Sequence, residues 1–323
     1  MRKLRAAVIG VGYLGNFHAQ KYALCPDVDL VSVVDTDSAR ASEVAAKYGA
    51  RAVTDYREVL PALDLVSIVV PPANHFEIAR DCLDAGVHAL VEKPVTERVE
   101  QAETLIALAT ERGLVLQVGH LERFNPVIRA LRQHVRDPRR IETQRFSAYK
   151  TRGTEVDVVL DLMIHDIDIV LSLAAGPVRS VQSSGTAVIT DSIDIAHARI
   201  EFESGLVAEL AASRVSQEQT RKLKVVESNG YLELDYVNHE LHRGVFENGR
   251  AREAATEVVF ATAGAAGVDV LMDEIYSFVH AVRHDQAPEV SGEDGKRALE
   301  LAIEISYRIT RHRAVPLSPS HRA

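Results

Sequence analysis

Up to about residue 120, short apolar runs alternate with longer stretches rich in Ala, Glu and Leu. Runs of this length are typical of buried strands, and the longer stretches have the length and composition of helices. The predicted strands are Leu4–Ile9, Val28–Val34, Leu65–Val70, His88–Val91 and Val115–Val118. The predicted helices include Tyr13–Ala23, Ser38–Tyr48, His75–Ala85 and Val99–Arg112. This alternation predicts an α/β fold with a doubly wound parallel sheet, which binds ligands beyond the carboxyl ends of its strands.

After about residue 140 the pattern changes to runs rich in β-branched residues, joined by short links. Two of these links, Glu203–Gly205 and Ser228–Gly230, have the composition of hairpin turns. The predicted strands are Ile141–Tyr149, Val178–Ile189, Ile193–Phe202, Leu206–Ser213, Arg221–Ser228 and Tyr231–Tyr236. Helices are predicted over Val158–Ala174, Asp269–Arg283 and Gly292–Arg311. The second half is therefore expected to be an α+β domain built on a large, mostly antiparallel open sheet that helices cover.

Three glycines follow the first predicted strand and open the first predicted helix. Gly10 and Gly12 let the backbone turn tightly and approach a pyrophosphate, and Gly15 lets the helix lie close on the sheet. Twenty residues later the second strand ends at Asp35, whose carboxylate can accept hydrogen bonds from an adenosine ribose. The alternative is a glycine turn with only a structural role. The expected cofactor-binding residues of this region are Gly10, Gly12, Tyr13, Leu14, Gly15 and Asp35.

The carboxylate of Asp35 also bears on which dinucleotide binds. It would repel the 2′-phosphate of NADP, so the sequence predicts NAD as the cofactor. Arg40 lies close enough in sequence to keep NADP as the alternative.

The predicted helix Val158–Ala174 carries a narrow polar stripe on an otherwise apolar surface. At about 100° per residue its members fall on one side of an α-helix. Lys and Glu are the usual residues of a solvated helix face, and the stripe contains neither. The stripe can therefore face either a cleft or the solvent, and the sequence does not decide between the two. A histidine on such a stripe can serve as a general base near neutral pH. The members of the stripe are Asp161, His165, Asp168 and Ser172.

The segment Glu92–Pro94, which contains Lys93, directly follows the predicted strand His88–Val91. A lysine at a strand end in a parallel sheet can stabilise a developing alkoxide. The alternative for Lys93 is a surface ion pair with its neighbour Glu92.

A metal site is the alternative interpretation of His165, in place of a general base. No further His, Cys or carboxylate falls at zinc-like spacing, so no metal is expected.

Composition limits the classes of protein. A length of 323 residues suggests two domains, and a net charge of −9 argues against a nucleic-acid partner. Cys25 and Cys82 are the only cysteines, too few for a disulfide framework, and free thiols suit a reducing cytoplasm. The apolar run near the start ends at the glycine loop, so we read it as a strand and not as a signal peptide. No run is long enough to span a bilayer, and we expect a cytoplasmic protein without a membrane partner.

With these residues in view, the chain resembles the Gfo/Idh/MocA family of nicotinamide-dependent oxidoreductases over nearly its whole length. The resemblance rests on Gly10–Gly15, Pro71–His75, Glu92–Pro94 and the Asp161-x-x-x-His165 helix. It implies a Rossmann domain over residues 1–121. A substrate-binding and oligomerisation domain would follow over residues 122–323, with its last helix able to pack back on the first domain. Homodimers or homotetramers through the open sheet are implied as well.

The resemblance also assigns roles to residues. It implies that Lys93 and His165 form the catalytic pair and that Asp161 helps to hold the substrate. Members of the family oxidise or reduce a sugar or cyclitol carbon. Further cofactor contacts are implied at Pro71, Asn74, His75, Glu92 and Lys93.

A finer resemblance comes from the segments Gln117–Pro126 and Asp157–Asp168. Both are similar to bacterial enzymes that oxidise the 3-hydroxyl of UDP-N-acetylglucosamine. In that branch a partner aminotransferase then installs a 3-amino group on the ketone, towards amide-linked lipid A or related sugars. The alternatives are a dehydrogenase of a free sugar or cyclitol, and, from another class, a non-catalytic NAD-binding regulator or structural subunit.

A nucleotide-sugar substrate would need cations for its diphosphate. The resemblance places the loop of Arg123 and Asn125 at the substrate pocket, and His120 is a further candidate on the substrate side. For the other cations, phosphate binding and a solvated surface charge both remain open. These are Arg145, Lys150 and Arg152.

Overall fold

The chain divides into two units, Met1–Asn125 with Val268–Leu299, and Pro126–Gly267 with Glu300–Ala323. The computed structural model describes residues 2–149, 156–236, 238–247, 250–251, 257–261 and 269–313. The first unit thus takes in a segment from near the end of the sequence, which we had expected in a domain starting at residue 122. The predicted Lys150 and the neighbouring Arg152 lie outside the described residues.

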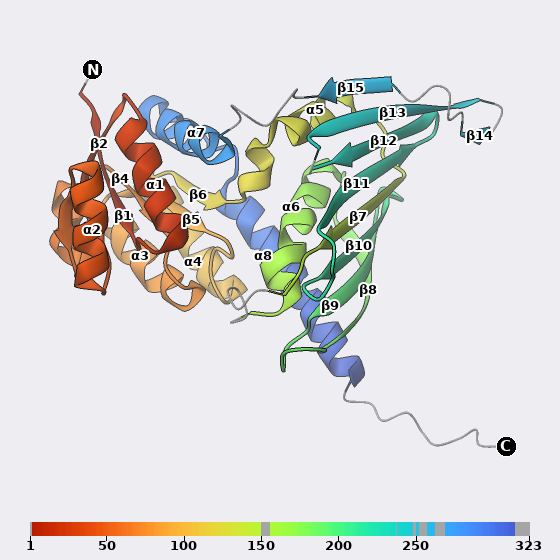
Figure 1. Cartoon of the computed structure of the whole chain (residues 1–323), viewed down its shortest axis with the longest axis horizontal. Helices are drawn as coiled ribbons and strands as arrows, with labels where there is room; N and C mark the ends of the chain where they lie inside the picture. The colour runs from red at the N-terminus through yellow and green to blue at the C-terminus, as the bar shows by residue number, and fades with distance from the viewer. Residues whose placement is uncertain are drawn as a thin grey trace. The chain divides into compact units, whose positions relative to one another are not determined.

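The first unit is built on six parallel strands in the order β3-β2-β1-β4-β5-β6 (Figure 1). This order, which runs outward in both directions from β1, confirms the predicted doubly wound sheet. The short strand β3 was not predicted, because two of its three residues are exposed and it has no apolar run. The strands are β1 (Leu4–Ile9), β2 (Val28–Val34), β3 (Arg51–Val53), β4 (Leu65–Ile68), β5 (His88–Glu92) and β6 (Leu116–Gly119).

Helices cover both faces of this sheet, as parallel sheets require. Alternate residues of β1 point to opposite faces: Ala6 and Val8 pack in one apolar cluster, Ala7 and Ile9 in another. The first cluster includes residues of α1, α2 and α7, and the second includes residues of α3 and α4. The helices are α1 (Tyr13–Leu24), α2 (Ser38–Tyr48), α3 (His75–Asp84), α4 (Val99–Arg112) and α7 (Val270–His284).

Helix α7 owes its place in the first unit to its apolar side. Ile275 and Phe278 are fully buried in the same cluster as Ala6 and Val8 of β1. Figure 1 shows α7, in blue, beside the red α1, and the two helices are in contact. The sequence predicted a helix over Asp269–Arg283, but a local pattern does not say which sheet a helix covers.

The second unit contains a nine-stranded sheet in the order β14-β13-β12-β11-β7-β10-β9-β8, with β15 paired to β13. Its strands pair antiparallel except for β7 with β10, so the predicted mostly antiparallel sheet is confirmed. The strands are β7 (Arg140–Phe146), β8 (Val178–Thr186), β9 (Ile195–Phe202), β10 (Val207–Ser213), β11 (Thr220–Glu227), β12 (Gly230–Asp235), β13 (Glu240–Glu247), β14 (Arg250–Ala251) and β15 (Glu257–Ala261).

Two helices of the second unit, α5 (Pro126–His134) and α6 (Ile164–Leu173), lie on one face of this sheet (Figure 1). The helix before α6 is a π-helix, η5, over Val159–Met163. The last helix, α8 (Gly292–Arg313), spans the division between the units. Within the described residues, we find no helix with the length and apolarity that crossing a membrane would need.

Candidate functional site

The glycine loop between β1 and α1 has two glycines that the fold requires and one that it does not. Gly10 has φ of +85°, and a Cβ there would collide with the carbonyl of Val69. A Cβ on Gly15 would overlap the carbonyl oxygen of Gly10. A Cβ on Gly12 would meet nothing within 4 Å. Gly12 is also the N-cap of α1, where no side chain caps the helix, so its backbone N–H groups are suited to an anion.

Asp35 directly follows β2 and holds this loop in place. Its Oδ2 accepts a hydrogen bond of 3.0 Å from the backbone N–H of Val11, and its Oδ1 accepts one of 3.0 Å from Asp37. The guanidinium of Arg40 lies 3.3 Å from both carboxylate oxygens. The carboxylate is therefore fixed where the second strand meets the glycine loop, as a ribose-binding acid must be.

A cavity of about 580 Å³ opens at the carboxyl ends of these strands, within the first unit. Its volume lies in the range of ligand pockets. Of the predicted cofactor residues, those that line it are Gly10, Gly12, Asp35, Pro71 and Asn74. It also takes in Arg40, together with Thr36, Thr54, Tyr56 and Arg57, which sequence reasoning missed. This site therefore fits a dinucleotide: it combines the glycine loop, the uncapped start of α1, the fixed carboxylate of Asp35 and a cavity of suitable volume.

His75 is buried and binds backbone on both sides. Its Nδ1 lies 2.8 Å from the carbonyl oxygen of Pro94, and its Nε2 lies 2.9 Å from that of Val70. Burial lowers the pKa of His75, although the two carbonyls oppose this shift. The ring thus ties the loop after β4, which contains Pro71, to the segment after β5, which contains Lys93. This places His75 behind the cavity wall and not among the residues that line it.

The two remaining predictions in the glycine loop have a different environment. The side chain of Tyr13 is 67% exposed and packs edge-on against Phe17, with ring centroids 5.3 Å apart. Leu14 is half-buried. Neither side chain lines the cavity.

Lys93 is half-buried directly after β5, and the Lys93–Pro94 peptide is cis. Its backbone N–H donates to Oε2 of Glu92 at 3.2 Å. Oε1 of Glu92 lies 3.2 Å from Nε2 of His18, which is fully buried on α1. Burial raises the pKa of Glu92, but the hydrogen bond from His18 and the charges of His18 and Lys93 lower it below its usual value. Glu92 is thus engaged with the buried His18, which the sequence reading of a surface ion pair with Lys93 did not foresee.

In the second unit, Asp161 and His165 lie on η5 and the first turn of α6, and both are half-buried. Of the other members of the predicted stripe, Asp168 is buried and Ser172 is half-buried. A π-helix has more residues per turn than an α-helix, so the assumed 100° spacing does not hold through Val159–Met163. The sequence contains no signal that would have revealed this π-helix.

Two of the candidate diphosphate cations, Arg123 and Arg145, form ion pairs within the protein. Arg123 is buried, and its Nη2 lies 3.7 Å from Oδ1 of Asp294. Arg145 is buried in an ion pair with Asp166, in which its Nη2 donates to Oδ1 at 2.8 Å. The other candidates near Arg123, which are His120 and Asn125, are also buried.

Comparisons with known proteins agree with this geometry. The family description "Oxidoreductase family, NAD-binding Rossmann fold" matches residues 4–120, and "GFO/IDH/MocA C-terminal domain" matches residues 127–233. A UDP-N-acetylglucosamine 3-dehydrogenase of Acidithiobacillus ferrooxidans is 39% identical over 311 residues, covering 96% of this chain and 98% of that protein. A solved structure under that name from the same organism matches with a TM-score of 0.88 at 38% identity, covering 96% of this chain and 99% of the other. The scyllo-inositol 2-dehydrogenase (NAD(+)) of Bacillus subtilis is 26% identical over 333 residues, 93% of this chain and 92% of that protein.

The fold, the cavity and these matches define an oxidoreductase whose first domain is an NAD-binding Rossmann fold. More particularly, the chain belongs to the Gfo/Idh/MocA family. The resemblance read from the sequence motifs is thereby confirmed, as is the prediction that the protein is an enzyme.

Proposed function

We propose that the protein is an NAD-dependent dehydrogenase that oxidises the 3-hydroxyl of UDP-N-acetylglucosamine. The product would be the 3-keto nucleotide sugar, which a partner aminotransferase would consume. The observation that carries this proposal is the 39% identity to a UDP-N-acetylglucosamine 3-dehydrogenase, which extends over 96% of this chain. Similarity of this extent covers both the cofactor domain and the domain that the family uses for its substrate.

NAD is the proposed cofactor, and Asp35 supports it over NADP. The carboxylate sits at the end of β2, where it accepts backbone hydrogen bonds and would repel a 2′-phosphate. Arg40, which lines the same cavity, lies against that carboxylate. The positive charge of Arg40 is therefore already partly neutralised and attracts a 2′-phosphate less strongly. When bound, the nicotinamide supplies the hydride acceptor.

The proposed chemistry of the chain's own residues follows from Lys93 and His165. One imidazole nitrogen of His165 takes the proton of the reacting hydroxyl as hydride leaves the same carbon. The ammonium of Lys93 stabilises the oxyanion that develops on that oxygen. The two roles exchange if Lys93 is the base, since a desolvated lysine can titrate near neutral pH. Asp161, one helical turn before His165, accepts a hydrogen bond from a sugar hydroxyl.

A second candidate is the oxidation of a free sugar or cyclitol. Two observations favour it: the 26% identity to a scyllo-inositol 2-dehydrogenase, and the engagement of Arg123 and Arg145 in ion pairs. A diphosphate would then depend on other cations, among which the sequence offers Lys150 and Arg152. A non-catalytic NAD-binding protein is disfavoured, because such a protein has no use for Lys93 and His165 together.

We also propose that the protein assembles through the open face of its large sheet. The helices α5 and α6 lie on the opposite face (Figure 1), and the open face carries a shallow depression of about 560 Å³. Its lining includes Gln144, Gln182, His197 and Arg199. Light scattering after size-exclusion chromatography tests this, and a monomer at micromolar concentration would reject it.

The test of the proposed function is the absorbance of NADH formed from NAD with UDP-N-acetylglucosamine, free N-acetylglucosamine or myo-inositol. A glutamate-dependent aminotransferase that acts on 3-keto nucleotide sugars is added to remove the ketone and pull the reaction forward. Turnover with the nucleotide sugar alone supports the proposal, and mass spectrometry of the product then locates the oxidised carbon. Turnover only with a free polyol would establish the second candidate instead. The His165→Ala variant is the control for background reduction of NAD.

A further inference from the structure

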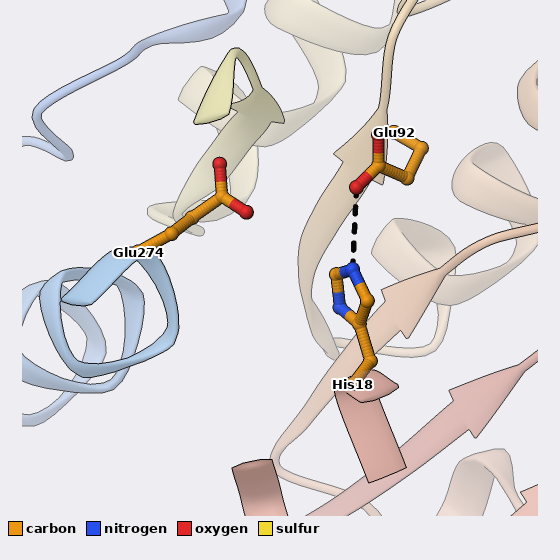
Figure 2. A group of neighbouring side chains, drawn as sticks. All are labelled: His18, Glu92 and Glu274. Carbon is orange, nitrogen blue, oxygen red and sulfur yellow. Dashed lines mark hydrogen bonds and ion pairs between the residues drawn. The ribbon is translucent and has the colours of Figure 1, made fainter. Parts of the chain in front are cut away.

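Three side chains from distant parts of the sequence converge inside the first unit. They are His18 on α1, Glu92 at the end of β5 and Glu274 on α7, and Figure 2 shows the three side chains as neighbours. One nitrogen or oxygen atom from each lies within 4.8 Å of those from the other two. His18 and Glu274 are fully buried, and the Glu92 side chain is only 12% exposed. Because the three residues lie far apart in the sequence, their spacing does not predict that they come together.

The hydrogen bonding of the cluster is incomplete. His18 Nε2 and Glu92 Oε1 are 3.2 Å apart. Within the described part of the chain, both carboxylate oxygens of Glu274 and Nδ1 of His18 have no hydrogen-bond partner. The Glu274 carboxylate points towards the other two side chains (Figure 2). Leaving such groups buried and unsatisfied costs about 1–3 kcal/mol each and more for a charged group, so a bound cation, or a proton on the carboxylate, would stabilise the cluster.

The surroundings hold these side chains on rigid elements. Glu92 lies next to Gly119 of β6, where a Cβ would come within 2.9 Å of the Glu92 carboxyl carbon. Gln117, two residues earlier, donates its Nε2 hydrogen to the backbone carbonyl of Glu274 at 3.3 Å. The strand β6 therefore both leaves room for one carboxylate and fixes the backbone that carries the other.

We propose that His18, Glu92 and Glu274 bind one divalent transition-metal ion, of the class of Zn²⁺ or Mn²⁺. One imidazole nitrogen and two carboxylate oxygens form a donor set that these ions accept, whereas Mg²⁺ and Ca²⁺ prefer oxygen ligands alone. The two positive charges offset the two buried carboxylates. Ligand bonds of about 2.0–2.2 Å would draw the three ligand atoms closer together than the 4.8 Å within which they now lie.

The ion would serve the architecture of the cofactor domain. It joins α7, which enters the first unit from near the end of the sequence, to α1 and to the strand end directly before Lys93. The inference is independent of which sugar the enzyme oxidises. The competing occupant is a proton, since burial and the nearby Glu92 raise the pKa of Glu274.

The test uses full-length protein purified without chelators or metal-affinity steps. Metal content is measured by plasma mass spectrometry, and the chelator-treated protein is then titrated with Zn²⁺ or Mn²⁺ while its Tm is followed. We expect one ion per chain and a rise in Tm on metal addition. In Glu274→Gln the affinity should fall by more than about 100-fold, because losing an outer-shell partner alone costs about 10–100-fold.

A matched control lies on the same helix. His280 and His284 are exposed on α7 with ring centroids 4.3 Å apart, a spacing at which a surface pair can capture Zn²⁺. His280→Gln should leave the proposed site intact. If this variant loses the metal and Glu274→Gln keeps it, the ion is adventitious and the proposal fails. The proposal also fails if the wild type takes up neither Zn²⁺ nor Mn²⁺ and its Tm does not change. Protons would then neutralise the cluster. X-ray absorption of the zinc-loaded wild type gives the same decision without any variant, since the proposed site supplies one imidazole and two carboxylates, whereas the pair of His280 and His284 supplies two imidazoles.

Discussion

Arg145 and Asp166 form an ion pair that is almost wholly removed from solvent inside the second unit. Their side chains are 4% and 3% exposed, and Nε of Arg145 lies 3.1 Å from both carboxylate oxygens. The guanidinium also lies over the ring of Tyr236, 5.3 Å from its centroid. The pair connects β7 to α6, the helix on which His165 stands. Arg145, which the sequence left open as either a phosphate ligand or a solvated surface charge, is therefore a buried structural cation.

Removing one partner of this pair should cost far more than removing both. We expect Arg145→Met to lower the free energy of unfolding by about 3–5 kcal/mol, because Asp166 would be left as an uncompensated buried charge. The double variant Arg145→Met with Asp166→Leu should recover much of that loss. Urea unfolding of the four proteins measures both values. A stable Arg145→Met whose only defect is a raised KM for a nucleotide sugar would show instead that Arg145 binds phosphate.

Asp194 should give the second unit part of its acid sensitivity. Burial would raise its pKa, but backbone N–H groups of Thr190, Val188 and Ile189 donate to the carboxylate and lower it to about 2. The unfolded value is about 4, so the ionised group adds stability above pH 4, and this is lost as the pH falls towards 2. The difference corresponds to about 2–3 kcal/mol at neutral pH.

The variant Asp194→Asn should therefore be less stable than wild type at pH 7, with the gap closing in acid. Urea unfolding at several pH values follows this directly. Asp191→Asn is the control, because Asp191 lies in the same loop but is exposed. An Asp194→Asn curve parallel to that of the wild type between pH 3 and 7 would contradict the argument.

The elements of the first unit were predictable where a continuous apolar run corresponds to one strand, or where a stretch of good helix formers corresponds to one helix. The predicted Ser38–Tyr48 and Val99–Arg112 have the bounds of α2 and α4. β13 was missed because charged residues interrupt Glu240–Glu247, so it presents no apolar run. Its place in the sheet is set by pairing with β12, which the local pattern does not encode.

The site divides in the same way. The glycine loop lies within six consecutive residues and faces one cavity. The spacing of its glycines in the sequence is therefore enough to predict their arrangement in space. The contact between Glu92 and His18 joins residues 74 positions apart, and that between Arg145 and Asp166 joins residues 21 apart. No periodicity reports such pairs, because tertiary packing brings them together. The charge of a residue was readable, but not whether a partner already neutralises it.

Gly12 and Gly15 should respond in opposite ways to the same methyl group. Gly12→Ala has space for its Cβ and a φ of −65°, so its Tm should match that of the wild type. NAD affinity should nevertheless fall, because the methyl group would occupy the approach of the pyrophosphate. Gly15→Ala should be destabilised or insoluble, since its Cβ overlaps the Gly10 carbonyl. Calorimetric NAD titration and thermal melts distinguish the two, and undiminished NAD binding by Gly12→Ala would place the pyrophosphate elsewhere.

Asp35→Ala should weaken the preference for NAD over NADP. A hydrogen bond to a charged group contributes about 1.5–3 kcal/mol, so the ratio of the two affinities should fall by about 10- to 100-fold. Arg40, no longer held by Asp35, would then be available to the 2′-phosphate. Adding Arg40→Ala to the variant should remove any gain in NADP binding. An unchanged ratio in Asp35→Ala would mean that this carboxylate does not contact the ribose.

Lys93 and His165 carry the proposed chemistry, and their variants should lose turnover without losing cofactor. Lys93→Ala and His165→Ala should each lower kcat by at least about 100-fold, the lower end of what a general acid or base supplies. NAD affinity and Tm should stay near wild type, since the glycine loop and Asp35 are untouched.

The pH profile of the residual activity then assigns the base. If His165 takes the proton, the limb of the profile near neutral pH disappears in His165→Asn and persists in Lys93→Met, and if lysine takes it the outcome reverses. Near-full activity in either alanine variant would remove that residue from the mechanism.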